Sequence, residues 1–178
     1  MRKALCAALL AAMGTYMAPA SAVTIASTTS LGDLTGVSAA IGRTFSAADY
    51  QDSFVDDYNF SLTAGSQVVG TTVTINLSVG ANTFQLSNMM ATLSDSTGAT
   101  VYALDNTLDA SNALQVSATV GSGAYRLRVT GDVTGNLGGG YGGVLQAAPV
   151  PEAQTYAMLL AGLVLVGFMA RRNARVSV

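Results

Sequence analysis

Three segments in the middle of the chain alternate apolar and polar residues with a period of two. This pattern predicts β-strands with one buried and one solvent-facing side. The segments are TTVTINLSV at residues 71–79, NALQVSATV at 112–120 and YRLRVTG at 125–131. In the last of them, Arg126 and Arg128 are predicted to point outward. The positions predicted to face the core are Val73, Ile75, Leu77, Val79, Leu114, Val116, Ala118, Val120, Tyr125, Leu127 and Val129.

Turn signals between the apolar segments indicate how the strands connect. GSG at 121–123 predicts a hairpin loop between the second and third segments. SDSTGATVYAL at 94–104 predicts a strand, a turn at Ser96–Gly98 and a second strand. Several short strands at this spacing predict an all-β fold, an antiparallel β-sandwich or jelly-roll-like domain. The glycine-rich stretch at 138–149 predicts a flexible linker after that domain.

The stretch FVDDYNFSL at 54–62 complicates the alternation. In a single strand, Asp56 would lie on the same face as Phe54 and Tyr58. A lone carboxylate on an apolar face is costly unless it is hydrogen-bonded. We therefore expect the strand to begin near Asp57, with Asp56 capping a turn by accepting backbone N–H bonds and Phe54 folding back.

A cation site is the alternative interpretation of the same region. Asp49, Asp52, Asp56 and Asp57 lie within nine residues. Calcium takes about six to eight oxygen ligands, several of them from carboxylates. The spacing does not match an EF-hand loop. We therefore predict a protein without a cofactor, with calcium binding as the alternative.

The two ends of the chain differ from the middle. Arg2–Lys3, the apolar stretch 4–17 and the small residues of APASA predict a signal peptide at 1–22, cut after Ala22 or alternatively after Ala20. Near the other end, the fifteen residues 156–170 are uncharged, and Gln154 and Thr155 extend the run weakly to eighteen residues from Ala153. A membrane span needs about 20 apolar residues, with a lower limit of roughly 17. We expect a transmembrane helix at 156–170, and the positive-inside rule makes the basic cluster after it cytoplasmic. That cluster is Arg171, Arg172 and Arg175.

Composition narrows the chemistry that the middle of the chain can perform. Residues 23–149 contain nine aspartates and three arginines, a net charge of −6, and no lysine, histidine, cysteine or tryptophan. An acidic domain without a basic patch is not expected to bind nucleic acid. Without histidine, cysteine or lysine, Ser–His and Cys–His catalysis, zinc sites and Schiff-base chemistry are excluded. Paired-carboxylate hydrolysis remains as an alternative, and we predict a protein that is not an enzyme and has no catalytic residue.

The tail VPEAQTYAMLLAGLVLVGFMARR resembles the PEP-CTERM sorting signal of Gram-negative bacteria. Val150, Pro151 and Glu152 match its sorting motif, and Ala153 replaces a proline at the third position. The resemblance implies recognition by exosortase, which would cut near Pro151–Glu152. It also implies an association with exopolysaccharide and biofilm.

The middle of the chain carries two further resemblances. Phe54, Asp56 and Tyr58 resemble the F-x-D-x-F motif of one PEP-CTERM family, with Tyr58 in place of the last phenylalanine. YRLRVTG is similar to the closing strand of bacterial pre-peptidase C-terminal β-sandwiches, which implies a fold and no function.

These observations predict the organisation of the chain. We expect a signal peptide at 1–22, a β-sandwich at 23–137, a linker at 138–149 and a sorting signal at 150–178. The protein would meet the secretion translocon, signal peptidase and exosortase, and exopolysaccharide as a matrix partner. It would be an inner-membrane-anchored precursor that ends at the cell surface or in the extracellular matrix, with a structural role. The alternatives are a calcium- or polysaccharide-binding module and a permanently membrane-tethered periplasmic domain.

Overall fold

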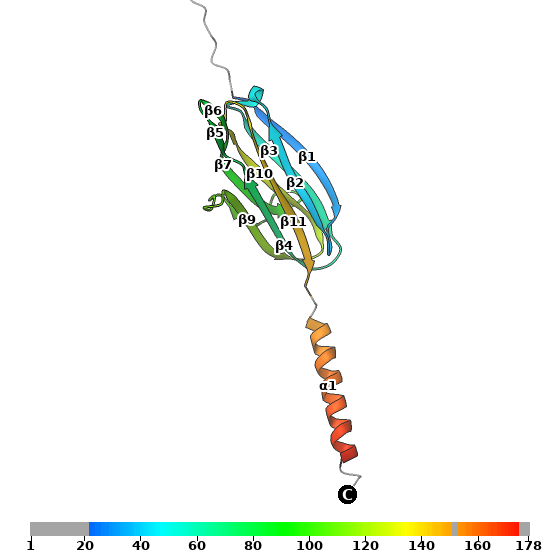
Figure 1. Ribbon diagram of the computed structural model, residues 1–178. Coiled ribbons are helices and arrows are strands. Elements are labelled where there is room, and N and C mark those ends of the chain that lie inside the picture. Colours follow the sequence, from blue (N-terminus) through cyan, green and yellow to red (C-terminus); the bar gives the residue numbers. More distant parts are fainter. Residues whose placement is uncertain (1–21, 151–152, 175–178) are drawn as a thin grey trace, which may run out of the picture.

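Two β-sheets packed face to face make up the body of the protein (Figure 1). The computed structural model describes residues 22–150 and 153–174, and within the last range the side chains of 157–169. One sheet, sheet A, contains in spatial order β1 (Thr24–Asp33), β3 (Ser53–Leu62), β10 (Gly123–Val133), β7 (Leu86–Asp95) and β8 (Val101–Asp105). The other, sheet B, contains β2 (Ser38–Phe45), β11 (Gly139–Pro149), β4 (Ser66–Thr74) and β9 (Ala113–Val120).

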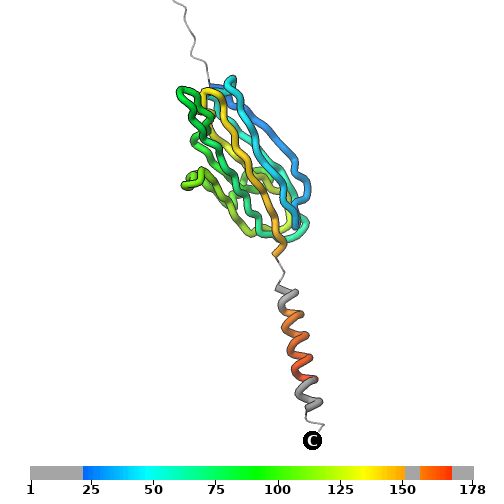
Figure 2. Tube along the Cα trace, viewed as in Figure 1, coloured from blue at the N-terminus to red at the C-terminus, as the bar shows by residue number. Residues whose placement is uncertain are grey.

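Three smaller elements complete the described chain. A 3₁₀ turn, η1 (Ala47–Asp49), precedes β3. The strands β5 (Leu77–Val79) and β6 (Asn82–Phe84) form a separate hairpin. The helix α1 (Ala153–Ala174) follows β11, and Figure 2 shows it at the end of the sandwich opposite the β5–β6 hairpin. The all-β prediction is therefore confirmed for the sandwich. The expected antiparallel pairing holds in every ladder of these sheets except β1 with β3, which is parallel.

The inner faces of the two sheets meet in one apolar core. Leu127 and Val129 of β10 are fully buried, as are Leu93 of β7 and Leu145 of β11. The rings of Phe45 in sheet B and Phe54 in sheet A lie 4.5 Å apart between centroids. The inward positions predicted for β9 and β10 are confirmed, because each strand keeps its alternation along its whole length.

The predicted orientation of residues 71–79 is wrong. β4 buries Thr72 and Thr74, whereas Val73, Ile75, Leu77 and Val79 are exposed. A shift of one residue in register exchanges the two faces of a strand. Here β4 pairs with both β9 and β11 so that Val68 enters the core, and the strand ends at Thr74. The last apolar positions belong to the β5–β6 hairpin.

The two predicted turns have different outcomes. The turn at Ser96–Gly98 is confirmed: β7 pairs with β8, and Asp95 accepts hydrogen bonds from the backbone N–H groups of Ala99 and Thr100. GSG at 121–123 is not a hairpin loop. It carries the chain from β9, at the edge of sheet B, to β10, in the middle of sheet A.

The predicted linker at 138–149 is also wrong, because Gly139–Pro149 is β11, a central strand of sheet B. Tyr141, Leu145 and Ala147 alternate into the core from this strand. Gly143 of this strand occupies a crowded position, because a β-carbon there would overlap the carbonyl oxygen of Thr71. The sandwich therefore extends past residue 137, to Pro149.

The predictions at the chain ends fall partly outside this structure. The signal peptide, 1–22, lies outside the described residues except for Ala22. Among the residues that are described, no helix combines the length and the apolar character needed to cross a membrane. This finding corrects the predicted transmembrane helix at 156–170 and the membrane anchoring that depended on it. The uncharged run 153–170 includes the polar residues Gln154 and Thr155, which leaves fifteen residues at 156–170, fewer than the roughly 17 that a span requires.

Replacing Gly143 with alanine tests the packing of β11. We expect Gly143→Ala to lower the free energy of unfolding by at least about 2 kcal/mol, because the new methyl group overlaps the backbone of β4. Gly142→Ala is the matched control, since a β-carbon there meets no atom within 4 Å. Its effect should stay within about 0.5 kcal/mol. Urea unfolding measures both, and equal effects would contradict this account of the glycines.

Candidate functional site

A carboxylate is buried between the two sheets. Asp56 lies on the inner face of β3 and is 2% exposed. From sheet B, the Arg43 guanidinium donates a hydrogen bond to Asp56 Oδ1 at 2.6 Å, and the Tyr141 hydroxyl donates one to Asp56 Oδ2 at 2.5 Å. Both oxygens of the carboxylate are thus held by the opposite sheet.

A second tyrosine extends this network. The hydroxyl oxygens of Tyr58 and Tyr141 lie 2.9 Å apart. Because Tyr141 already donates its proton to Asp56, the Tyr58 hydroxyl donates to Tyr141. Tyr58 in turn accepts a hydrogen bond from the backbone N–H of Gly42 at 3.0 Å. One chain of hydrogen bonds therefore joins β3 of sheet A to β2 and β11 of sheet B.

The structure overturns the predicted turn at Asp56. β3 is continuous from Ser53 to Leu62, and Phe54, Asp56 and Tyr58 share its inner face. The cost of burying a lone carboxylate was the reason for expecting otherwise. Arg43 and Tyr141 offset that cost by charge-assisted hydrogen bonds, and they reach Asp56 from strands 13 and 85 residues away.

Aromatic rings surround this network. Burial, followed by the hydrogen bond to Asp56, raises the pKa of the Tyr141 phenol, so it stays protonated and acts as a donor. The Tyr141 ring stacks on Phe54 at 5.6 Å, and the Arg43 guanidinium lies 5.1 Å from the Phe45 ring centroid. The strong hydrogen bonds of the network are internal, so its geometry fits a link between sheets.

Asp57, the next residue, points to the outer face of sheet A. Arg128 donates two hydrogen bonds to its carboxylate, both at 2.7 Å. The Arg126 Nη1 atom lies 3.8 Å from the same carboxylate. The Arg128 hydrogen bond lowers the pKa of Asp57 below its usual value. The outward orientation predicted for both arginines is confirmed.

The four aspartates considered as calcium ligands do not converge. Asp49 caps η1 by accepting hydrogen bonds from the Ser46 backbone and hydroxyl, and Asp52 accepts one from the Val23 N–H. Asp56 and Asp57 lie on opposite faces of β3. In the described ranges, no group of three or more His, Cys, Asp or Glu side chains could hold a metal ion. Calcium binding stays a prediction from the sequence.

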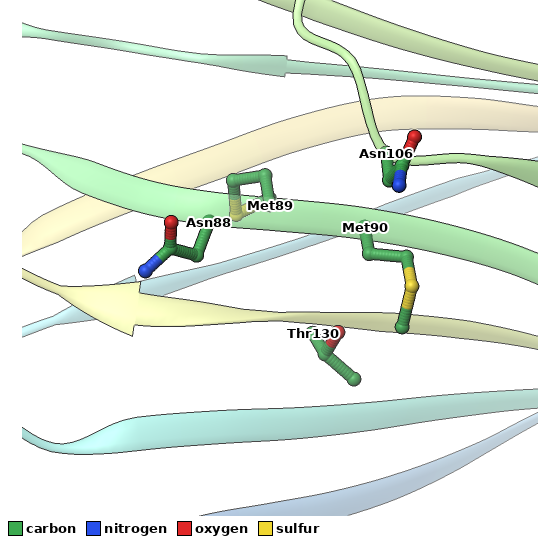
Figure 3. Close-up of a pocket in the computed structure, with 5 residues that line it drawn as sticks. All are labelled: Asn88, Met89, Met90, Asn106 and Thr130. Carbon is green, nitrogen blue, oxygen red and sulfur yellow. The ribbon is translucent and has the colours of Figure 1, made fainter.

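A shallow pocket of about 300 Å³ lies over β7 and β10 (Figure 3). Its lining residues are Asn88, Met89, Met90, Asn106 and Thr130. The Asn88 side chain donates a hydrogen bond to Asp132 Oδ2 at 2.6 Å. Amide, hydroxyl and thioether groups line this pocket without a carboxylate. This pocket could not be predicted from the sequence, because residues 88–90, 106 and 130 come together only in the fold and none belongs to a recognisable motif.

Much of the predicted sorting signal lies outside the described residues. Val150 is described, and its backbone N–H donates to the Gly65 carbonyl at 3.0 Å. Pro151, Glu152 and Arg175 fall in the undescribed ranges. Arg171 and Arg172 belong to α1, where only the backbone is described at those positions.

Comparison with known proteins identifies this tail. The family model of the PEP-CTERM protein-sorting motif matches residues 149–173. This match confirms the resemblance seen in the sequence, and the motif implies an exported protein with exosortase as its processing partner. A search of curated proteins returned no match.

Two solved structures match this chain at low similarity. The pre-peptidase C-terminal domain of collagenase from Bacillus anthracis is 16% identical, with a TM-score of 0.45, and the match covers 68% of this chain and 94% of that one. PliG of Aeromonas hydrophila, a periplasmic inhibitor of g-type lysozyme, is 15% identical, with a TM-score of 0.37 and coverage of 69% and 99%.

The Asp56 network can be tested by removing its charge. Asp56→Asn should lower the free energy of unfolding by roughly 3 kcal/mol, because it leaves Arg43 beside the core without its counter-charge. Asp57→Asn makes the same change one residue later, on the outer face, and should cost only about 1 kcal/mol. Urea unfolding at neutral pH compares the two. A larger loss for Asp57→Asn would contradict the central place given to Asp56.

The Asp57–Arg128 pair should also contribute to acid sensitivity. A carboxyl whose pKa is lowered by folding stabilises the protein above its unfolded pKa, which is about 3.9, and this contribution is lost as pH falls through the lower folded pKa. Asp57→Asn removes the titrating group. Its stability deficit relative to the unsubstituted protein should therefore shrink between about pH 6 and pH 2. A deficit that stays constant in urea unfolding across this range would exclude the pair as a source of pH dependence.

Proposed function

We propose that this chain, which carries a PEP-CTERM protein-sorting motif, delivers its β-sandwich to the cell surface or extracellular matrix and serves there as a structural, non-enzymatic component. The position of the motif carries this proposal. The matched region begins at residue 149, and β11 ends at the same residue. Cleavage near Pro151–Glu152 would therefore release a sandwich with all of its strands.

The arrangement of the sandwich supports a structural role. Its central carboxylate is enclosed by internal hydrogen bonds, and the pocket over β7 and β10 has no acidic or nucleophilic residue except the Thr130 hydroxyl. The domain is also closed without any disulfide, since residues 23–149 contain no cysteine. A packed core joined by an internal ion pair is suited to an exported protein that must stay folded outside the cell.

Intact mass of the protein tests this proposal. In a host that encodes exosortase, protein recovered from the outer fractions and medium should begin near Val23 and end near Pro151. Glu152→Ala should abolish this processing, and Gln154→Ala, two residues further along the same tail, serves as the control. Protein from a host lacking exosortase should keep its C-terminal residues. Recovery of full-tail protein from the exosortase-containing host would overturn the proposal.

A further inference from the structure

The outer face of sheet B carries no ionisable side chain. Its outward positions alternate with the core positions of β2, β11, β4 and β9, all of which are described. Arg43 is the charged residue of these strands, and it points inward to Asp56. The outward positions are occupied by glycine, alanine, serine, threonine, valine and glutamine alone.

Strand register places small residues side by side across this face. Gly42 pairs with Gly142, which pairs with Val73. In the next outward row, Ala40 pairs with Val144, which pairs with Thr71. Without long side chains, the middle of the face is flat, and another sheet can approach its backbone closely.

The apolar part of the face continues toward the β5–β6 hairpin. Val144 and Val73 are 49% and 42% exposed, and Ile75 and Leu77 beyond them are 69% and 52% exposed. Ile75, Leu77 and Phe84 line an apolar groove of about 220 Å³ together with Thr44 and Gly140 of sheet B. A contiguous exposed apolar surface of this kind is typical of an interaction site.

The charge distribution indicates what can cover this face. Residues 23–149 have a net charge of −6, and the outer face of sheet A carries Asp57, Asp132 and both outward arginines. Two copies of such a domain repel each other at long range. The outer face of sheet B is where two copies can meet without placing like charges in contact.

We propose that two copies of this protein associate through the outer faces of sheet B, related by a two-fold axis. Such an interface uses the same patch on both subunits, so a neutral, flat face is self-complementary. Four strands spaced about 4.8 Å apart and about nine residues long cover roughly 600 Å² in projection. Two copies bury about 1,200 Å², the lower limit for a specific interface, which the hairpin groove would enlarge. Because the buried area is at this lower limit, we expect the dimer to be reversible. The interface does not involve the sorting motif.

Sedimentation equilibrium of the full chain across a range of concentrations tests this interface. The unsubstituted protein should show a monomer–dimer equilibrium. Val144→Asp places two carboxylates at the centre of the interface and should weaken dimerisation at least tenfold. Val101→Asp is the matched control, because this valine is 54% exposed on β8 of sheet A, and it should leave the equilibrium unchanged. Gln146→Asp, at an exposed polar position of the same face, gives a second test if Val144→Asp does not fold.

Cross-linking locates the contact directly. Val144→Cys introduces the one cysteine outside residues 1–22, and a bismaleimide should join two copies through it but not through Val101→Cys. A protein that is monomeric at all concentrations would overturn the proposal. So would dimerisation that survives both Val144→Asp and Gln146→Asp, since the contact would then lie elsewhere, α1 included. A monomeric protein could instead be retained on a neutral polysaccharide, with Val144→Asp abolishing the retention. That result would overturn the dimer and assign the face to glycan binding.

Discussion

The hydrogen bonds that hold Asp56 between the sheets constrain the rest of the sandwich. A buried charge is tolerated only where its partners are in place, and those partners come from β2 and β11 in the opposite layer. Sliding either sheet by one residue would remove Arg43 or Tyr141 from reach and leave a carboxylate in the core. An apolar contact in the same position would be compatible with many relative alignments of the two sheets. We therefore interpret the network as fixing the alignment of the two layers.

The same constraint explains the outer surfaces. Once Asp56 faces inward, alternation along β3 requires Asp57 to face outward, where Arg128 binds it. In sheet B, Tyr141 and Leu145 face inward, and their neighbours Gly142 and Val144 must then face solvent. The inward orientation of Asp56 and Tyr141 thus determines which residues face outward. The outer face of sheet A is charged as a result, and that of sheet B is neutral.

The sequence correctly predicted the elements that are determined by neighbouring residues in the chain. β9 and β10 kept their alternation to the end, and the β7–β8 turn contains both the capping Asp95 and Gly98 with φ of 80°. It did not predict the face of β4, because partners at least 40 residues away set that register. It failed at Asp56 for the same reason, since the nearest residue that binds it is 13 positions away. The glycine-rich stretch was misread as a linker because close packing such as that of Gly143 against Thr71 leaves no trace in composition.

The position of β11 has a consequence for the order of folding. Among the described residues it is the last strand, and yet it lies between β2 and β4 in the middle of sheet B. Until it arrives, both neighbours present unpaired edges, and Asp56 lacks Tyr141. Most contacts in this topology join distant parts of the chain, which slows folding. The strand that completes the sandwich is thus the segment immediately before the sorting motif. A chain truncated ahead of it would have open strand edges and a tendency to aggregate.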